Sequence, residues 1–499
     1  MNIQWTHLPS IKALHIYGPT SQQTEGIVYD SRDVQSQFAF FCIIGEETDG
    51  HLYIDEAIQN GASTIVGSKK ESIETYTSLY PNVTFLLVPD AREALAYTAV
   101  EFNNHASEKL IKVGITGTNG KTTVATYVRD LLNLVGLPCG MLGTNGIFTS
   151  ADKLSIKKST PTTPMSSDIQ AVFNELVKRG DKAASMEVSS IALDQHRVSG
   201  FEFDVAIHTN LSEEHMEYHK TFDHYKQCKL RLFSQTKASV INIDDWDLGQ
   251  DILEITKGTT LTYSNNSNSQ ADLIWTNIHH LATGMSFDLN VQGNLHRIVV
   301  PIYGEYNVGN LVSAIGAALL IGIPIEKVLV ALPKMRQVDG RFQVIHGPED
   351  RKIVLDYAHT PVALDAIMNA VKKLPHNRLI TLIAGIGIRD FAKMPKMAKT
   401  AEGKADVLVV TVDHPGDNDP WKVIDAVLCG FTEPYLQEVL TAPSRKEAVI
   451  KSLEASQPGD IILLTSGCIN GAQVVRGEFI PHSDEDIIHD FFHTTKLVV

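Results

Sequence analysis

The segment at residues 114–123, which reads GITGTNGKTT, constrains the fold of this chain more than any other. An apolar run at residues 110–113 precedes it, and a helical pattern at residues 124–135 follows it. A strand, a glycine-rich turn and a helix in this order form a phosphate cradle, because backbone N–H groups and the helix dipole both attract anions. Lys121 is expected to reach the outer phosphates, and the hydroxyl of Thr122 is expected to coordinate Mg²⁺. The segment therefore predicts a nucleotide-binding α/β domain.

The spacing of this segment differs by one residue from the usual P-loop. Four residues normally separate the first glycine from Gly-Lys, whereas here Ile115 occupies the first glycine's position and Gly114 lies one residue earlier. The alternative interpretation is a tight turn that carries Lys-Thr without binding a nucleotide. The strand before the turn and the helix after it favour phosphate binding.

Composition narrows the class of protein. The chain has 499 residues, too many for one hydrophobic core, and its net charge of −15 disfavours broad electrostatic binding to nucleic acid or anionic lipid. Its 5 cysteines form no CxxC pair, which favours buried free thiols over a zinc site or a disulfide framework. The N-terminus lacks a signal-peptide core, and the longest apolar stretch, residues 314–323, is too short to cross a bilayer. We expect a soluble, cytoplasmic protein.

Strand and helix patterns alternate along the chain and divide it into three α/β blocks, at residues 1–108, 109–337 and 338–499. A polar break at residues 103–107 is a plausible linker. The second block predicts a mostly parallel sheet that is covered on both faces, and the third predicts a second doubly wound sheet. The strand candidates are residues 26–30, 38–44, 63–66, 84–88, 183–188, 205–209, 238–243, 353–355, 379–384, 407–411 and 460–465, and the helix candidates include 92–104 and 307–321.

Polar residues follow two of these strands, where open α/β sheets bind their ligands. Glu187 ends one strand and is a candidate Mg²⁺ ligand, although a strand-end glutamate is also a common helix cap. His215 and His219 are four residues apart, so on a helix they would share one face, and metal ligation competes there with a solvated acidic helix start. Lys229 stands among apolar residues and, taken alone, would be a surface lysine with its charge in water.

Several further motifs, taken together with the glycine-rich loop, resemble one family over nearly the whole chain. They are DSR at 30–32, DGH at 49–51, AIQNGA at 57–62, TTP at 162–164, MEVSS at 186–190, QHRV at 195–198, TNLS at 209–212, EH at 214–215, YH at 218–219, GEYNVGN at 304–310, GR at 340–341 and DYAHTP at 356–361. They are similar to motifs of the Mur ligases, above all the UDP-N-acetylmuramoyl-tripeptide synthetases. The resemblance implies a three-domain architecture: a UDP-sugar-binding domain, a central P-loop domain and a C-terminal Rossmann-like domain.

The resemblance also implies a role for each matched residue. The predicted catalytic residues are Lys121, Glu187, His215 and Lys229, the last as N6-carboxylysine formed with CO₂. The predicted Mg²⁺ ligands are Thr122, Glu187, His215 and Lys229. The predicted ATP contacts are Gly117, Thr118, Asn119, Gly120, Lys121, Thr122, Thr123, Asn310, Arg341 and Asp356. The predicted contacts of the UDP-sugar dipeptide are Ser31, Thr162, Thr163, Ser189, Gln195 and Arg197. The predicted amino-acid pocket holds Arg389, Asp413 and His414.

The activity implied by the resemblance is an ATP-dependent, ADP-forming amide ligation in peptidoglycan synthesis, and thus in maintaining cell shape and division. The γ-carboxylate of UDP-N-acetylmuramoyl-L-alanyl-D-glutamate would attack the γ-phosphate of ATP to give an acyl phosphate, which the amine of an amino acid then attacks. ATP, Mg²⁺ and CO₂ are the expected cofactors, and the partners are small molecules rather than nucleic acid or membrane. We expect a monomer.

The chain departs from the family pattern in the amino-acid pocket. Members that add meso-diaminopimelate carry Asp-Asn-Pro-Arg where residues 413–416 read DHPG, so the arginine that would read the distal carboxylate is replaced by Gly416. The family's Gly-Lys-Gly-His-Glu turn reads GCING at residues 467–471. These changes predict an amino acid other than meso-diaminopimelate, with Arg389 still available for an α-carboxylate.

Three other functions remain open. A paralogous ligase would use another carboxylate donor, such as a folate or a specialised peptide, but the motifs at residues 30–32 and 49–51 count against a folate. A regulatory nucleotide-binding protein would bind ATP without forming an amide. A small-molecule P-loop kinase explains neither Lys229 nor the first block.

Overall fold

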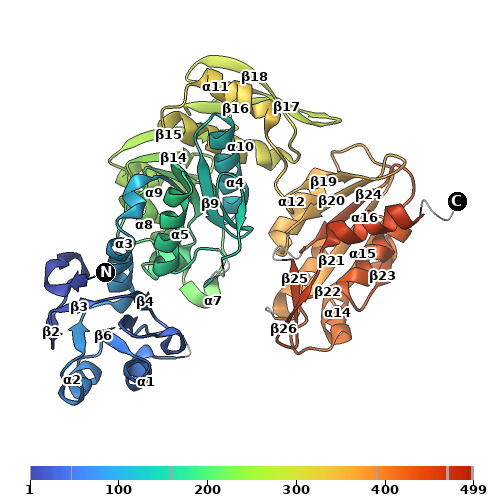
Figure 1. The fold of residues 1–499 in the computed structure, drawn as a ribbon. Coiled ribbons are helices and arrows are strands. Elements are labelled where there is room, and N and C mark those ends of the chain that lie inside the picture. Colours follow the sequence, from blue (N-terminus) through green and yellow to red (C-terminus); the bar gives the residue numbers. More distant parts are fainter. Residues whose placement is uncertain are drawn as a thin grey trace. The chain divides into compact units, whose positions relative to one another are not determined.

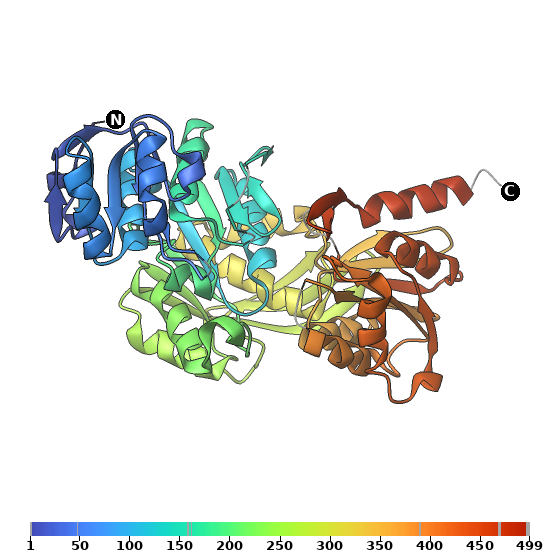
Figure 2. The same ribbon diagram turned by 90° about the horizontal axis from the view of Figure 1, so that it is seen from below.

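A computed structural model describes residues 2–46, 48–156, 159–160, 162–388, 391–467 and 471–495. The chain forms two compact units, shown in Figures 1 and 2. The first contains Met1–Ile274 and Val312–Val328, and the second contains Trp275–Leu311 and Leu329–Val499. The three domain ranges expected from the sequence, 1–108, 109–337 and 338–499, stay predictions.

The N-terminal part of the first unit is a five-stranded sheet in the order β2-β7-β6-β5-β4. Strands β4 to β7 are parallel, and β2 is antiparallel to β7. Helices α1 and α2 pack on one face and α3 on the other, because alternate strand residues are apolar on both faces (Figure 1). The elements are β2 (His15–Tyr17), β4 (Gly26–Val28), β5 (Phe38–Phe41), α1 (Ile54–Gln59), β6 (Ala62–Gly67), α2 (Lys70–Leu79), β7 (Thr84–Leu87) and α3 (Ala91–Phe102), with a small antiparallel pair of β1 (Asn2–Gln4) and β3 (Ser21–Gln23).

The central sheet places three strand ends at the glycine-rich loop. Strand β8 lies between β12 and β13, all three parallel, with Glu187 paired to Ile115 and His208 paired to Thr116. The order from the edge is β11-β10-β9-β12-β8-β13-β14-β15. Its elements are β8 (Ile111–Thr116), α4 (Lys121–Leu134), β9 (Cys139–Gly143), β10 (Gly146–Phe148), β11 (Lys153–Leu154), α5 (Ser166–Lys178), β12 (Ala183–Glu187), α6 (Ser190–Asp194), β13 (Val205–His208), α7 (Met216–His219), α8 (Phe222–Ser234), β14 (Ala238–Asn242), α9 (Trp246–Ile255) and β15 (Thr259–Ser264).

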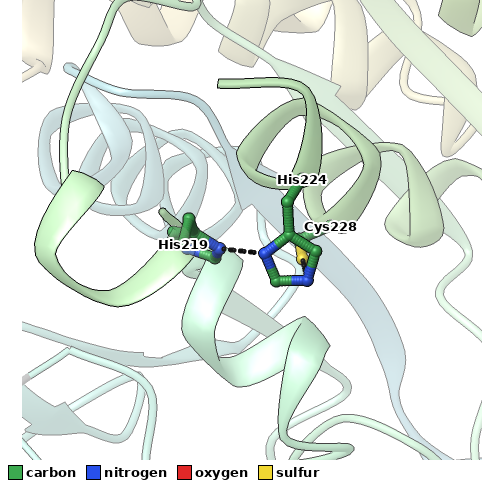
Figure 3. A group of neighbouring side chains, drawn as sticks. All are labelled: His219, His224 and Cys228. Carbon is green, nitrogen blue, oxygen red and sulfur yellow. Dashed lines mark hydrogen bonds between the residues drawn. The ribbon is translucent and has the colours of Figure 1, made fainter. Parts of the chain in front are cut away.

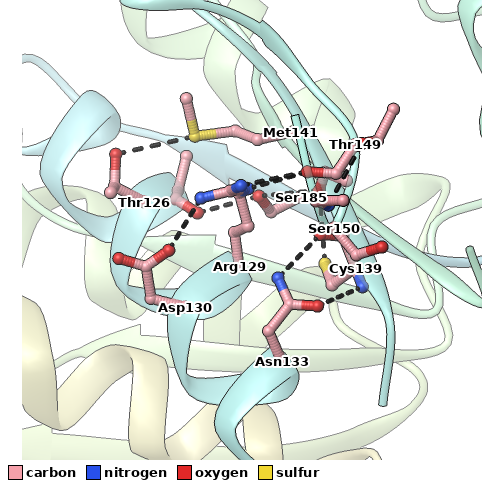
Figure 4. Close-up of polar contacts among 12 residues, drawn as sticks. Thr126, Arg129, Asp130, Asn133, Cys139, Met141, Thr149, Ser150 and Ser185 are labelled. Carbon is pink, nitrogen blue, oxygen red and sulfur yellow. Dashed lines mark hydrogen bonds and ion pairs between the residues drawn. The ribbon is translucent and has the colours of Figure 1, made fainter. Parts of the chain in front are cut away.

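Polar contacts attach helix α4 to the strands beside it (Figure 4). The side-chain amide of Asn133 donates to the carbonyl of Cys139 at 3.0 Å and accepts from its N–H at 2.9 Å. Arg129 donates to the carbonyl of Thr149 through Nε and Nη2, at 3.2 and 3.0 Å. The hydroxyl of Ser185, on β12, donates to the carbonyl of Ala125 at 2.8 Å. These bonds hold the helix that begins at the glycine-rich loop in a fixed position on its sheet.

A stretch without predicted strands proves to be β structure. Strand β16 (Leu273–Leu281) starts in the first unit, where Leu273 and Ile274 pair with β15. In the second unit β17 (Gly284–Val291) and β18 (Asn294–Val300) follow it in the sheet. Helices α10 (Glu305–Leu320) and α11 (Ile325–Ala331) come next, and α10 contains all but the last residue of the helix predicted at residues 307–321.

The C-terminal part of the second unit is a six-stranded sheet in the order β19-β20-β24-β21-β22-β23, parallel except for β19. Strand residues alternate between two apolar clusters, so α12, α13 and α14 cover one face and α15 and α16 cover the other (Figure 1). The elements are β19 (Gln343–His346), β20 (Lys352–Asp356), α12 (Pro361–Val371), β21 (Leu379–Ile386), α13 (Met394–Ala401), β22 (Val407–Asp413), α14 (Pro420–Leu428), β23 (Glu438–Thr441), α15 (Arg445–Glu454), β24 (Ile461–Thr465), the hairpin β25 (Ala472–Val475) and β26 (Glu478–Pro481), and α16 (Asp484–Thr495).

The predicted α/β class and the second doubly wound sheet are confirmed. The expectation about cysteines is confirmed for Cys42, Cys139 and Cys228, which are buried free thiols, but it is wrong for Cys429, which follows α14 at the surface. Cys468 lies outside the described residues. No helix in the described residues is long and apolar enough to cross a membrane.

A buried ion pair joins the last helix to the C-terminal sheet. The guanidinium of Arg445, at the start of α15, bonds the carboxylate of Asp484 at 2.6 Å and the carbonyl of Thr465 at 2.9 Å. His482 also pairs with Asp484, at 2.7 Å. Burial by itself favours the neutral acid, but the charge of Arg445 and the hydrogen bonds outweigh it, so the pKa of Asp484 lies well below its usual range.

We expect Asp484→Asn to lower the free energy of unfolding of the second unit by about 3–5 kcal/mol at neutral pH, because it removes the negative charge that offsets the buried Arg445 guanidinium. Folding lowers the pKa of Asp484, so the stabilisation by its carboxylate is present above the unfolded-state pKa of about 3.9 and is lost as the pH falls below that value. The difference in unfolding free energy between the native protein and the variant therefore becomes smaller in acid. Urea unfolding at several pH values measures this gap. Asp490→Asn, on the exposed side of the same helix, is the matched control. An equal effect from both variants would contradict the ion-pair argument.

Candidate nucleotide and substrate site

The loop at residues 117–120 has backbone angles that only glycine adopts easily at its two ends. Gly117 has φ +149° and Gly120, the residue before α4, has φ +88°. A Cβ atom at Gly117 would overlap the hydroxyl of Thr209, so a side chain is excluded there by space as well as by conformation. The loop thus turns tightly into the N-terminus of α4, the arrangement that binds phosphate.

The segment after β13 holds this loop from outside. The N–H of Thr118 donates to the carbonyl of Asn210 at 2.8 Å, and the N–H of Asn119 donates to the Asn210 side chain at 2.9 Å. The hydroxyl of Thr209 donates to the carbonyl of Asn119 at 2.6 Å. The hydroxyl of Thr118 also donates to the carbonyl of Ser212 at 3.0 Å and accepts from the N–H of Ser212 at 2.9 Å. The loop is therefore preorganised by tertiary contacts.

Lys121 folds back over the loop. Its ammonium donates to the carbonyls of Gly117 and Thr118, both at 2.9 Å. A phosphate in the cradle would offer this cation a stronger, charged acceptor than two neutral carbonyls. Thr123, the last residue of the predicted loop motif, is buried in the first turn of α4.

Thr122 and Glu187 meet as predicted for a Mg²⁺ site. The hydroxyl of Thr122 donates to Oε2 of Glu187 at 2.9 Å, and this carboxylate is 1% exposed. Thr144, which follows β9, donates its N–H to Oε1 at 2.6 Å and its hydroxyl to Oε2 at 3.2 Å. A hydroxyl and a carboxylate held at a phosphate loop are hard oxygen ligands of the kind that Mg²⁺ prefers. The donor set therefore fits Mg²⁺.

Lys229 is buried, against the expectation for a lysine taken alone. It lies on α8, its side chain is 1% exposed, and its amine donates to the carbonyl of Gly117 at 2.7 Å. Burial, together with the charge of Lys121, lowers the pKa of Lys229 well below its usual value. The ring of Tyr225 lies 4.6 Å from Nζ, and its hydroxyl is 3.0 Å from that of Thr118. A neutral amine at this position is a nucleophile directed at the phosphate loop.

His215 does not share a helical face with His219, because α7 begins at Met216 and His215 precedes it in a left-handed conformation, φ +59°. Its ring is half exposed and pairs with Glu217 at 3.4 Å and Glu214 at 4.0 Å. Among the described residues, no hydrogen bond or ion pair joins His215 to Glu187 or Lys229. Its role as a Mg²⁺ ligand stays a prediction.

Five of the six residues predicted for the UDP-sugar dipeptide form one hydrogen-bonded cluster. Thr163 bonds the N–H of Ser189 at 3.0 Å and the carbonyl of Glu187 at 3.0 Å. Arg197 donates to the Thr163 carbonyl at 2.9 Å and to the Gln195 side chain at 2.7 Å, and Thr162 is within 3.4 Å of Thr144.

Burial, followed by the nearby charge of Arg92, lowers the pKa of Arg197, so an anionic ligand would stabilise this guanidinium. Arg92 itself reaches Gln195 from α3, at 3.4 Å, which links the first sheet to this cluster. Ser31, the sixth residue, is buried in the N-terminal part, where its hydroxyl donates to Glu56 at 3.0 Å.

The remaining predicted ATP contacts lie in the second unit. Asp356 accepts from the N–H groups of Phe342 and Ala358 at 2.8 and 2.9 Å. Burial raises the pKa of Asp356, and the neighbouring charge of Arg341 offsets part of this effect. Arg341 lies 4.8 Å over the ring of Tyr357, and the Asn310 amide donates to Asn307 at 3.0 Å.

Two residues of the predicted amino-acid pocket lie at the end of β22, where Asp413 is the last strand residue and His414 follows it. Asp413 is buried and accepts from the side chain of Gln473 at 2.8 Å, and His414 accepts from the N–H of Val474 at 3.0 Å. Arg389 lies outside the described residues.

Three models of known families match successive parts of the chain. They are the catalytic domain of the Mur ligase family at residues 23–103, the Mur ligase middle domain at 115–318 and the Mur ligase glutamate ligase domain at 340–468. The UDP-N-acetylmuramoyl-L-alanyl-D-glutamate–2,6-diaminopimelate ligase of Clostridium botulinum is 34% identical over 471 residues, which cover 94% of this chain and 95% of that protein. The chain belongs to the Mur ligase family. The enzyme of the same name from Bacteroides fragilis is 32% identical over 98% of this chain and 99% of its own length.

Solved structures agree with this membership. A UDP-N-acetylmuramoyl-L-alanyl-D-glutamate–2,6-diaminopimelate ligase superposes with a TM-score of 0.70 at 26% identity, over 99% of this chain and 100% of that one. The MurF ligase of Thermotoga maritima in complex with ADP has a TM-score of 0.62 at 17% identity, over 95% of this chain and 99% of that one, and supports the fold alone. Mur ligases are ATP-dependent amide-bond ligases that use Mg²⁺.

The structure of this Mur ligase adds Thr144 to the site. Sequence reasoning missed it, although it follows a buried strand in the string GTNG at residues 143–146, which is a strand-end signal like that of Glu187. Its two bonds orient the Glu187 carboxylate toward Thr122.

We expect Glu187→Gln to weaken binding of Mg²⁺-ATP at least about tenfold, because the amide keeps the shape but loses the charge that attracts the cation. Isothermal titration with a non-hydrolysable ATP analogue, with and without Mg²⁺, measures the effect, which should vanish without the metal. Glu175→Gln, an exposed position on α5, is the matched control. Equal Mg²⁺ dependence in the variant and the native protein would count against Glu187 as a ligand.

Proposed function

We propose that this protein joins an amino acid to the D-glutamate γ-carboxyl group of UDP-N-acetylmuramoyl-L-alanyl-D-glutamate, with ATP as the energy source. The observation that best supports this function is the hydrogen bond from the buried amine of Lys229 to the carbonyl oxygen of Gly117. The amine of Lys121 donates to the same oxygen. The names of the relatives and the cluster around Arg197 support the UDP-sugar dipeptide as the carboxylate donor.

The low pKa of Lys229 supports its modification by CO₂. A neutral Nζ attacks the carbon of CO₂, one C–N bond forms and one proton leaves, so the residue changes from a potential cation to an anion. This change removes the repulsion between Lys229 and Lys121 that contributes to the lowered pKa. It also adds carboxylate oxygens at the phosphate loop, and these, together with Thr122 and Glu187, would give Mg²⁺ a set of oxygen ligands.

The chain's residues then serve phosphoryl transfer followed by amide formation. The loop N–H groups and Lys121 would hold the triphosphate and offset the charge that builds on the transferred phosphoryl group. Mg²⁺, when bound, supplies further positive charge at the same oxygens. The substrate γ-carboxylate takes the γ-phosphoryl group and ADP leaves. The amine of the amino acid attacks the acyl phosphate, and phosphate leaves as the amide forms.

The amino acid that is added is proposed to differ from meso-diaminopimelate. Gly416 has no side chain for the distal carboxylate, and its N–H and carbonyl are bonded to Val474 and Arg476, at 3.1 and 2.8 Å. The relatives named above are called diaminopimelate ligases, so this proposal gives the chain an amino acid other than the one in their names.

A screen of amino acids tests the reaction and the acceptor together. Purified protein, Mg²⁺, ATP and the UDP-sugar dipeptide are incubated with each amino acid, and ADP release and product mass are measured. We expect one added residue per molecule of ADP, with meso-diaminopimelate a poor acceptor. Efficient use of meso-diaminopimelate would refute the acceptor proposal alone. ATP hydrolysis without an amide product for any amino acid would refute the ligase proposal and favour a regulatory protein.

We expect Lys229→Ala to lower turnover by about 10²–10³-fold, because the anionic group beside the nucleotide is lost. Short carboxylates such as formate or acetate should restore part of the activity by entering the space that the side chain leaves. Lys226→Ala, on the same helix and paired with Asp251 at 2.7 Å, is the control and should keep full activity. Full activity of the Lys229 variant would remove the carbamate from the mechanism.

A further inference from the structure

A second group of potential metal ligands lies outside the nucleotide site, at the corner between α7 and α8. His219 ends α7, and His224 and Cys228 lie four residues apart on α8, so they face the same side of that helix (Figure 3). One ligand atom from each of the three side chains lies within 4.8 Å of the others. Nδ1 of His219 is 3.2 Å from Nδ1 of His224, and Nε2 of His224 is 3.6 Å from Sγ of Cys228.

These separations suit a tetrahedral cation with nitrogen and sulfur ligands. With Zn–N bonds of about 2.0–2.1 Å, two imidazole nitrogens in a tetrahedral site stand about 3.3 Å apart. In the structure Nδ1 of His224 faces His219 and Nε2 faces Cys228. Because an ion binds one nitrogen of each ring, the His224 ring must turn about its Cβ–Cγ bond to bind an ion together with both neighbours. That torsion is soft, and the side chain of His224 is 41% exposed, so the ring has room to turn and an ion has access.

Asp194 is the candidate for a fourth ligand, because it lies beside two of these three side chains. Its Oδ1 is 3.4 Å from Nε2 of His224 and 3.6 Å from Sγ of Cys228. It ends helix α6, and its other oxygen accepts from the hydroxyl of Tyr218 at 2.9 Å. Arg231 also approaches Oδ1, at 3.1 Å, which fixes the carboxylate without closing the side that faces the thiol.

His219 is prepared to act as a neutral ligand. Burial, followed by the charge of His224, lowers the pKa of His219 to about 4, so the ring is uncharged near neutral pH. Its Nε2 lies 2.9 Å from the hydroxyl of Ser190, which leaves Nδ1 as the nitrogen directed at the cluster. A hydrogen bond on the far nitrogen is the usual support for a ligating histidine.

We propose that His219, His224 and Cys228, with Asp194, bind a Zn²⁺-class cation. Thiolate and imidazole select such borderline cations over Mg²⁺, which requires oxygen ligands, so this site is chemically separate from that of Thr122 and Glu187. The ligands come from α6, α7 and α8, and the bound ion links these three helices. Lys229 directly follows Cys228, so the ion also fixes the turn of α8 that carries the buried amine.

Cobalt titration tests the proposal without any enzyme assay. Protein stripped with EDTA is titrated with Co²⁺, and the near-ultraviolet charge-transfer band of a cobalt–thiolate bond is followed. We expect the native protein to show the band at a single equivalent, with loss of the band on adding Zn²⁺ and no loss with excess Mg²⁺. Zn²⁺ should also raise the unfolding temperature, because it binds only the folded state.

Variants identify the ligands. Cys228→Ser should abolish the band, and His224→Ala should weaken Co²⁺ binding at least roughly tenfold. Cys429→Ser, which removes an exposed thiol elsewhere, should behave as the native protein. Thermal unfolding in EDTA checks that the variants fold. If Cys228→Ser does not fold, the proposal is tested with His224→Ala, which changes a half-exposed side chain. A band that survives in Cys228→Ser, unchanged affinity in His224→Ala, or no band in the folded native protein would overturn the proposal.

Discussion

The hydrogen bond from the buried amine of Lys229 to the carbonyl of Gly117 is the contact on which the site depends. It requires the amine to leave water, which is unfavourable for an ammonium and acceptable for a neutral amine. It also requires α8 to lie against the glycine-rich loop, where Lys121 already occupies the same carbonyl. Two positive charges at this point would repel each other, so the fold favours a neutral Lys229. The low pKa is thus a consequence of where α8 packs.

The parallel sheet explains why the other site residues converge there. Because Glu187 of β12 pairs with Ile115 of β8, the carboxylate emerges beside the loop, and Thr122, in the first turn of α4, faces it. On the opposite side, β13 brings the backbone and side chains of residues 209–212 to the loop. The carboxyl ends of three neighbouring strands therefore supply the predicted metal ligand, the loop and its outer support.

The sequence predicted the elements that carry long apolar runs. Buried parallel strands such as β21 and β22 read as mostly apolar segments, so the sequence indicated their positions. It did not predict β16 and β18, where more buried residues alternate with more exposed ones over much of the strand, because the exposed positions make such a strand read as polar. The alternation itself, at period two, was the available signal.

In the site, too, some features follow from the local sequence and others depend on tertiary structure. Lys121, Thr122 and Glu187 follow from local motifs, because each lies at a predictable end of an element. The burial of Lys229 is tertiary, since its neighbours on α8 include the surface residues Lys226 and Arg231 as well as apolar ones. The His219–His224–Cys228 group also depends on tertiary structure, because α7 ends after a single turn and the chain reverses before α8.

The backbone of the loop after β22 restricts which residue can stand at position 416. His414 and Gly416 have φ +45° and +62°, and the hairpin of β25 and β26 bonds both residues as well as Asp413. A Cβ at Gly416 would stand 2.7 Å from the side chain of Ile388. An arginine at this position would therefore meet both a strained conformation and a steric clash. Placing an arginine there requires the hairpin and the loop to move together, so the proposed difference in the acceptor amino acid would rest on the backbone of the second unit.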